Sequence, residues 1–204
     1  GDKVVSVQLT NGEDEIVIAN RNGRAIRFNE SDVRPMGRAA TGVTSMQLDG
    51  EDDAVVGMVA VNDPQNEHVV VLSEKGYGKR SALNDEEGNP IYRVTSRRAK
   101  GVKTIDITEK TGKLIAIRAV DDSKDMMIIN KSGITIRLHV DTIRQTGRVA
   151  QGVKLIDITK RNDVISSVCV VNEEGNPIIP ENTENVNVEN AEVNEAENTE
   201  TNNE

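Results

Sequence analysis

Arginines at three recurring positions are the residues of this chain best suited to bind a polyanion. The turn glycines Gly23, Gly76 and Gly133 and the corner glycines Gly42, Gly101 and Gly152 define a common frame. One arginine lies four residues after each turn glycine, a second lies four residues before each corner glycine, and a third lies four residues before the second: Arg27, Arg80 and Arg137; Arg38, Arg97 and Arg148; Arg34, Arg93 and Arg144. A guanidinium stays charged and can donate two parallel hydrogen bonds to phosphate. An array of guanidinium groups at regular spacing along a curved edge suits the phosphates of a bent polyanion.

Five further basic residues lie near this array and join the predicted phosphate contacts: Arg24, Lys79, Arg98, Lys100 and Lys103. A second interpretation stays open, because an arginine on a strand also commonly solubilises a face or pairs with a carboxylate. The sequence offers no aromatic platform for unpaired bases and no apparent helix for a major groove. Contacts to phosphates should therefore be insensitive to base sequence, and DNA bendability should supply any preference.

These positions recur because the chain repeats itself at a period of roughly 50 to 60 residues, which is typical of propeller blades. Each repeat predicts a strand, a tight glycine turn, a second strand, a third strand from the Gly-Val corner and a closing fourth strand. We expect third strands at 43–48, 102–107 and 153–158, and fourth strands at 54–59, 114–117 and 164–170. With abundant Val and Ile, no Trp, one Phe and two Tyr, the chain favours an all-β fold of four-stranded antiparallel blades.

The repeat frame also predicts the organisation of the chain. Residues 1–9 are predicted to be the last strand of a preceding blade, because Lys3–Leu9 has the pattern of a fourth strand. Blades then occupy 10–61, 62–120 and 121–171, so we expect a partial array of about three blades cut from a longer protein. The second repeat has six more residues around Asn84–Pro90, which we expect to form a surface loop.

The charge of the chain is divided unevenly. Residues 172–204 contain ten Glu and no Asp, Lys or Arg, so 24 of the 34 acidic residues remain in 1–171 beside all 25 basic ones. We expect 172–204 to be a disordered acidic tail. It either solubilises the protein or competes with DNA for the basic residues.

Several short motifs resemble one known family. The strings Gly12–Glu15, Ser31–Gly37, Thr41–Val43, Gly76–Arg80, Lys100–Val102 and Gln151–Val153 are similar to the C-terminal domain of the DNA gyrase A subunit. The resemblance covers residues 1 to about 171 and implies the last three blades of a six-bladed β-pinwheel. It implies that the blades bind and wrap double-stranded DNA in an enzyme that introduces negative supercoils. The family's basic box is absent, and the nearest similar segment, Ser96–Gly101, lacks its glycine pair.

The same resemblance implies partners and cofactors outside this chain. A second copy of the gyrase A protein and the gyrase B subunit would associate through the absent N-terminal part. The parent enzyme, a type II DNA topoisomerase, would use ATP and Mg²⁺ through the absent domains and through gyrase B. We expect no cofactor in this fragment. The catalytic tyrosine of the family also belongs to an absent domain.

Enzymatic interpretations of the chain itself find little support. His68 and His139 are isolated from other metal-ligating residues, so we expect no metal site. Gly76-Tyr77-Gly78 is typical of a turn, and neither Tyr77 nor Tyr92 has the context of a nucleophile, so we expect no catalytic residue.

The single cysteine and the lengths of the apolar runs bear on the compartment. Cys169 lies in an apolar run and is expected to be a small core residue. No run is long enough to span a membrane, and we expect a cytoplasmic protein without membrane contact.

Two rival functions remain open. One is the equivalent domain of topoisomerase IV, the decatenating relative of gyrase. The other is a propeller that binds proteins, which predicts no salt-sensitive DNA binding.

Overall fold

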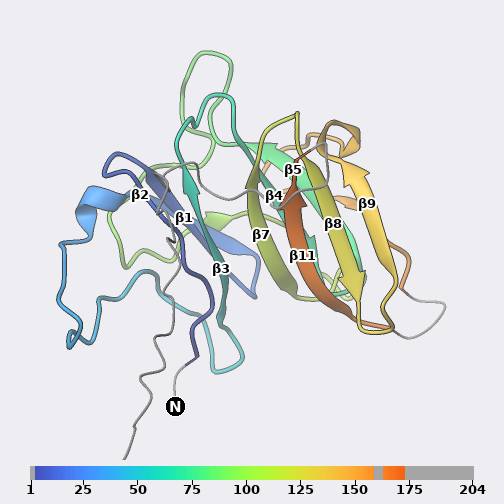
Figure 1. The fold of residues 1–204 in the computed structure, drawn as a ribbon, viewed down its shortest axis with the longest axis horizontal. Coiled ribbons are helices and arrows are strands. Elements are labelled where there is room, and N and C mark those ends of the chain that lie inside the picture. Colours follow the sequence, from blue (N-terminus) through green and yellow to red (C-terminus); the bar gives the residue numbers. More distant parts are fainter. Residues whose placement is uncertain (1–2, 159–162, 173–204) are drawn as a thin grey trace, which may run out of the picture.

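A computed structural model of the chain describes residues 3–158 and 163–172, and almost all regular structure in them is β. Figure 1 shows the strands gathered into three adjoining sheets. Two short 3-10 helices, η1 (Glu30–Asp32) and η2 (Val140–Thr142), each follow a hairpin. The strands are β1 (Glu15–Asn20), β2 (Arg24–Asn29), β3 (Val55–Val61), β4 (His68–Ser73), β5 (Tyr77–Ala82), β6 (Val102–Lys103), β7 (Leu114–Val120), β8 (Asp125–Asn130), β9 (Thr135–His139), β10 (Val153–Lys154) and β11 (Ile165–Val171).

The predicted hairpins and fourth strands are confirmed. β1–β2, β4–β5 and β8–β9 are antiparallel pairs, and each turn contains a glycine with positive φ. β3, β7 and β11 pair with the first strand of their own repeat, as a closing strand should. The all-β antiparallel architecture follows from these local patterns.

The third strands differ from the prediction in length and in partner. The first sheet has the order β3-β1-β2-β6, so β6 from the second repeat completes the sheet of the first. The second sheet has the order β10-β5-β4-β7, which takes β10 from the third repeat in the same way. The third sheet, β11-β8-β9, has three strands among the described residues, and the expected strand at 43–48 does not form. Consecutive repeats are therefore interlocked rather than merely stacked.

The corner glycines Gly101 and Gly152 lie where the third strands of the second and third repeats meet the preceding hairpin. Gly101 has a φ of +73°, and a Cβ there would overlap the carbonyl oxygen of Ala25. Gly152 stands in the same relation to the carbonyl of Gly78. After two paired residues the chain turns over the preceding hairpin, where the backbone N–H of Thr104 donates to the carbonyl of Gly23 (2.8 Å). Glycine permits this close approach of two backbones, which fixes where the segment after the corner crosses the preceding hairpin.

The apolar cores lie between the sheets. One core joins Val17 and Val59 of the first sheet to Val69 and Ile117 of the second, and Tyr92 lies in it, 1% exposed. A second core joins Val70 and Leu72 to Met126, Ile128 and Val168 of the third sheet. β3, β7 and β11 lie next to one another along the middle of the molecule (Figure 1). Each repeat thus buries its apolar face against its neighbour.

The segment before β1 is not the strand that its pattern predicts. Val4 and Val7 are 84% and 78% exposed, and the segment has no strand pairing. Its contacts to the first sheet are side-chain hydrogen bonds, from Ser6 Oγ and Gln8 Nε2 to the carbonyl of Met58, each 3.3 Å. An alternating pattern does not by itself supply a partner edge, and the assignment of residues 1–9 to a preceding blade stays a prediction.

The predicted surface loop in the second repeat is confirmed. Asn84 and Pro90 form an isolated bridge at its base, and Glu86–Asn89 are exposed. The Asp85 carboxylate accepts hydrogen bonds from the backbone N–H groups of Glu87 (3.1 Å) and Asn89 (2.7 Å). The loop is therefore held by its own side chains.

The other predictions on organisation are tested less fully. The predicted acidic tail lies outside the described residues except for Asn172, and the predicted blade boundaries stay a prediction. Within the described ranges, no helix has the length and apolarity to cross a membrane.

Candidate nucleic-acid interface

The arginines four residues after the turn glycines are tied to the protein. Arg27 is 2% exposed. Its Nε donates to Glu15 Oε2 (2.6 Å), and its Nη1 donates to the carbonyls of Leu83 and Tyr92, each 3.1 Å. The acid comes from the first sheet and the carbonyls from the second repeat. Arg27 therefore joins two repeats from inside, and a phosphate in solvent does not reach it in this conformation.

Arg80 and Arg137 follow the same plan with different acids. Arg80, 7% exposed, forms an ion pair with Asp122. Its neighbour His68 has a lowered pKa, first because of burial and then because of the Arg80 charge. Arg137 is 43% exposed at its side chain and pairs with Asp125, the residue that corresponds to Glu15. All three arginines of this register have an acidic partner, as structural arginines do.

The arginines four residues before the corner glycines link consecutive loops. Arg97 Nη1 donates to the carbonyl of Thr44 (3.0 Å), and Arg148 Nη1 donates to the carbonyl of Lys103 (2.6 Å). Thr44 and Lys103 each stand two residues after a corner glycine, so the two contacts are equivalent. Both side chains stay partly exposed, and Arg38 of the first repeat is exposed. Arg97 and Arg148 thus join repeats and still present charge at the surface, whereas Arg38 makes no such contact with the described residues.

The third register is exposed and unpaired. Arg34, Arg93 and Arg144 are exposed, and none of them forms a hydrogen bond or ion pair with the described part of the chain. Each follows directly on an anchored apolar residue: half-buried Val33, and Tyr92 and Ile143, both 1% exposed. The fold thus fixes the backbone beneath each free guanidinium. A hollow of about 550 Å³ is lined by both Arg34 and Arg97, which brings the first two repeats together at one surface.

The five further basic residues also divide into exposed side chains and side chains bound to the protein. Arg98 and Lys100 are exposed, and Arg98 has a φ of +70°. Lys103 pairs with Asp106 at 2.7 Å, and Arg24 Nη1 donates to the carbonyl of Gly101 at 3.3 Å. The fifth, Lys79, is buried.

Lys79 takes the place of an apolar residue. It is 0% exposed, and the corresponding residues of the other repeats are Ile26 and Ile136. Its Nζ donates to Ser81 Oγ (2.8 Å) and to the carbonyls of Gly147 (3.0 Å) and Arg148 (2.8 Å). Burial, with a smaller effect of the Arg148 charge, lowers the pKa of Lys79 to about 7. This lysine holds the second repeat to the third and does not face solvent.

One basic surface feature was missed from the sequence. Lys110 and Lys154 place their ammonium groups over the ring of Tyr77, at 5.3 and 5.8 Å from its centroid. Lys154 is paired with Tyr77 across the β10–β5 edge, which no repeat count could reveal because the strands come from different repeats. In the described ranges, no group of three or more His, Cys, Asp or Glu could hold a metal ion.

Comparison with known proteins identifies the repeats. The family model described as DNA gyrase C-terminal domain, beta-propeller, matches residues 14–62, 67–121 and 124–172. The A subunit of DNA gyrase from Deinococcus deserti is 41% identical over 176 residues, which are 85% of this chain and 21% of that protein. The A subunit of DNA gyrase from Staphylococcus aureus (strain MRSA252) is 41% identical over 173 residues, 85% of this chain and 19% of that protein. The chain therefore spans about a fifth of the length of these curated relatives.

Solved structures agree with this assignment. The C-terminal domain of DNA topoisomerase IV superposes with a TM-score of 0.73 at 26% identity, covering 84% of this chain and 50% of that one. The DNA gyrase A C-terminal domain superposes with a TM-score of 0.65 at 25% identity, covering 76% of this chain and 50% of that one. The interlocked four-stranded sheets, the order of the motifs and these matches agree, and the chain belongs to the DNA gyrase C-terminal domain family of β-propellers.

Proposed function

We propose that this chain binds and wraps duplex DNA without sequence preference, as part of the gyrase A protein of a type II topoisomerase. The observation that carries the proposal is the exposed, unpaired register of Arg34, Arg93 and Arg144. A structural arginine in this chain has an acidic or carbonyl partner, as Arg27 does. The free register has neither within the described ranges, which leaves its charges available to phosphate.

The fold supports contact with a backbone rather than with bases. Each repeat supplies one arginine of this register without a partner among the described residues, and the interlocked sheets fix the distances between repeats. The helices of the described ranges are three residues long, too short to enter a major groove as a recognition helix. Regularly spaced cations on a rigid scaffold position a duplex through its phosphates.

The wider role is also a proposal. The curated relatives at 41% identity are gyrase A subunits, which supports a gyrase. The solved topoisomerase IV and gyrase A domains, at 26% and 25% identity, do not separate the two enzymes. We propose a parent enzyme that introduces negative supercoils in the cytoplasm, built from two copies of the gyrase A protein together with gyrase B. ATP and Mg²⁺ would act outside this chain, whose described residues offer no cluster suited to a metal.

The test is the salt dependence of duplex DNA binding by the 204-residue chain and by an R34Q/R93Q/R144Q variant. Each phosphate contact contributes about 0.9 to the slope of log affinity against log salt. We expect a steep slope for the wild type and a slope lower by about 2 to 3 for the variant. Fluorescence anisotropy with two duplexes of unrelated sequence would measure both the slope and the lack of sequence preference.

A matched control is available at the opposite end of the hairpins. Arg21, Lys75 and Lys131 lie in the three hairpin turns and are also exposed, one in each repeat. An R21Q/K75Q/K131Q variant loses the same charge and should keep most of the slope. Equal loss in both variants would mean that net charge alone drives binding. Absence of salt-sensitive binding in the wild type would favour a protein-binding propeller instead.

A further inference from the structure

Strands β3, β7 and β11, which lie next to one another along the middle of the molecule, are called the inner strands below. Arg118 is a charged residue on one of them, at a position where the other two have an uncharged residue. It lies on β7, paired with Val70, and the corresponding residues of the first and third repeats are Val59 and Cys169. Those two repeats build the same strand without a charge. The blade therefore does not require an arginine at this position.

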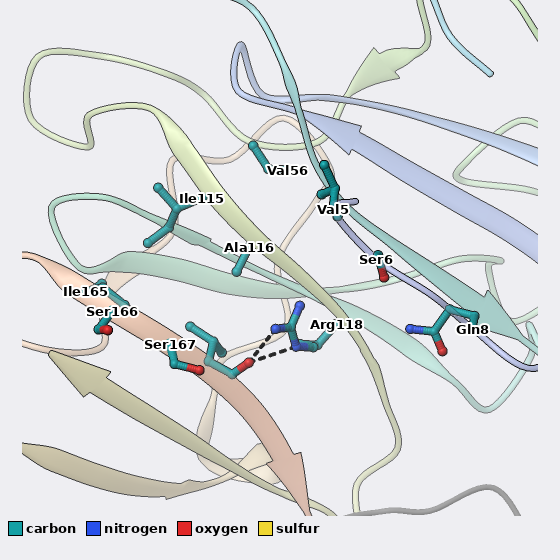
Figure 2. Close-up of a pocket in the computed structure, with 12 residues that line it drawn as sticks. Val5, Ser6, Gln8, Val56, Ile115, Ala116, Arg118, Ile165, Ser166 and Ser167 are labelled. Carbon is teal, nitrogen blue, oxygen red and sulfur yellow. Dashed lines mark hydrogen bonds between the residues drawn. The ribbon is translucent and has the colours of Figure 1, made fainter. Parts of the chain in front are cut away.

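A cavity of about 420 Å³ opens beside this arginine, between the segment before β1 and strands β3, β7 and β11. Figure 2 shows the guanidinium in the middle of the lining residues, with Ser6 and Gln8 on one side and Ser166 and Ser167 on the other. The lining contains hydroxyl and amide donors, and no Asp or Glu among the residues that the structure describes. Its only formal charge in that set is the guanidinium.

The hydrogen bonds of Arg118 leave part of its donor capacity unused. Nε and Nη2 both donate to the carbonyl of Val168, and Nη1 donates to the carbonyl of Ile117 (2.7 Å). A guanidinium has five N–H donors, so two remain. Arg118 forms no ion pair with a described residue, although Glu67 and Asp121 line a neighbouring hollow that it also lines. Burial lowers the pKa of Arg118 from its usual value. A half-buried cation without a counter-charge is costly, and a bound anion would offset that cost.

We propose that this cavity binds a small phosphate-type oxyanion through Arg118, with the Ser167 hydroxyl and the second N–H of the Gln8 amide as neutral donors around it. A guanidinium fork and hydroxyl groups are the donors that phosphate oxygens prefer. The site lies on the inner strands, apart from Arg34, Arg93 and Arg144, so it does not depend on the DNA-binding proposal. The cavity is too small for a duplex and suits inorganic phosphate or the phosphate group of a small metabolite.

The test is a titration of the ¹⁵N-labelled 204-residue chain with inorganic phosphate, followed by NMR. Sodium chloride replaces phosphate at equal ionic strength in the reference series. We expect saturable shifts of the Arg118 Nε–H signal and of the amides of Ser6, Gln8 and Ser167, with a dissociation constant on the order of 1 mM. R118V copies the residue of the first repeat, and we expect it to weaken binding at least about tenfold.

Two further variants separate anion binding from a purely structural role. R118K keeps the charge but loses the fork, and we expect an intermediate affinity, which also serves if R118V fails to fold. The R34Q/R93Q/R144Q variant should keep the phosphate shifts unchanged. The proposal is overturned if phosphate and chloride give the same shifts, or if R118V and R118K both bind phosphate as the wild type does. It is equally overturned if the shifts disappear in the triple variant, because the anion would then bind at Arg34, Arg93 and Arg144.

Discussion

The two boundaries between repeats have the same backbone crossing but different buried polar chemistry. At the first boundary, Arg27 carries the buried charge and Glu15 neutralises it. At the second, Arg80 is likewise buried and paired with Asp122, and a second buried cation, Lys79, donates to a hydroxyl and two backbone carbonyls. The exchange of strands is thus the common feature, whereas the side chains that reinforce it can vary and can carry different responses to pH.

The largest expected effect is at the first boundary. Arg27→Ala should lower the free energy of unfolding by about 3–5 kcal/mol, because it leaves Glu15 and the carbonyls of Leu83 and Tyr92 without their donor. Urea denaturation followed by circular dichroism measures it. Arg34→Ala, at an exposed unpaired side chain, is the control and should change stability by less than about 0.5 kcal/mol. Similar losses in the two variants would remove the distinction between buried and free registers.

The next prediction concerns the crossing shared by both boundaries. Gly101→Ala should destabilise the protein by about 2 kcal/mol more than Gly42→Ala, because its Cβ would overlap the Ala25 backbone. Gly42 has a φ of +83° but open space around it, so its substitution costs only the backbone strain. Thermal unfolding of the pair measures the difference. Equal losses of stability in the two variants would show that the backbones at Gly101 and Ala25 lie farther apart than in this structure.

A further effect of similar size, and the sharpest contrast, is the pH response of the second boundary. The folded-state pKa of Lys79, about 7, lies below its value in the unfolded chain, so the unfolded state binds more protons above pH 7. The stability of the wild type should therefore rise relative to Lys79→Met, by about 2 kcal/mol between about pH 7 and pH 9. Denaturation at matched pH values measures the difference. A constant offset across this range would mean that the lysine keeps its proton when buried.

Local signals predicted most of the fold. A turn glycine between alternating apolar residues specifies a hairpin from neighbouring residues alone, as at Gly23, Gly76 and Gly133. The partner of a third strand is a long-range choice, and Val102 has the same pattern whichever hairpin it joins. The strand exchange therefore needed the structure, as did the failure of Lys3–Leu9 to pair.

The repeated positions of the arginines were recognised from the sequence, whereas their contacts within the protein needed the structure, and contact with phosphate stays a prediction. Spacing identified equivalent arginines, yet duplication preserves a residue whether it is buried or exposed, so Arg27 and Arg34 looked alike. Lys79 could have been recognised, because it stands where Ile26 and Ile136 stand in the other repeats. Tyr92 gave no such signal, because its burial depends on a hydrogen bond between its hydroxyl and that of Thr104 (2.6 Å) in the crossing segment.

The exchanged strand also delays completion of the first sheet while the chain is being synthesised. Arg24 pairs with Lys103, which lies 79 positions later in the chain. At synthesis rates of about 5–20 residues per second, Lys103 is made about 4–16 s after Arg24. The hairpin β1–β2 forms in microseconds, so its outer edge waits open on the ribosome for most of that time. We therefore expect the first sheet to be completed only after the second repeat has been translated.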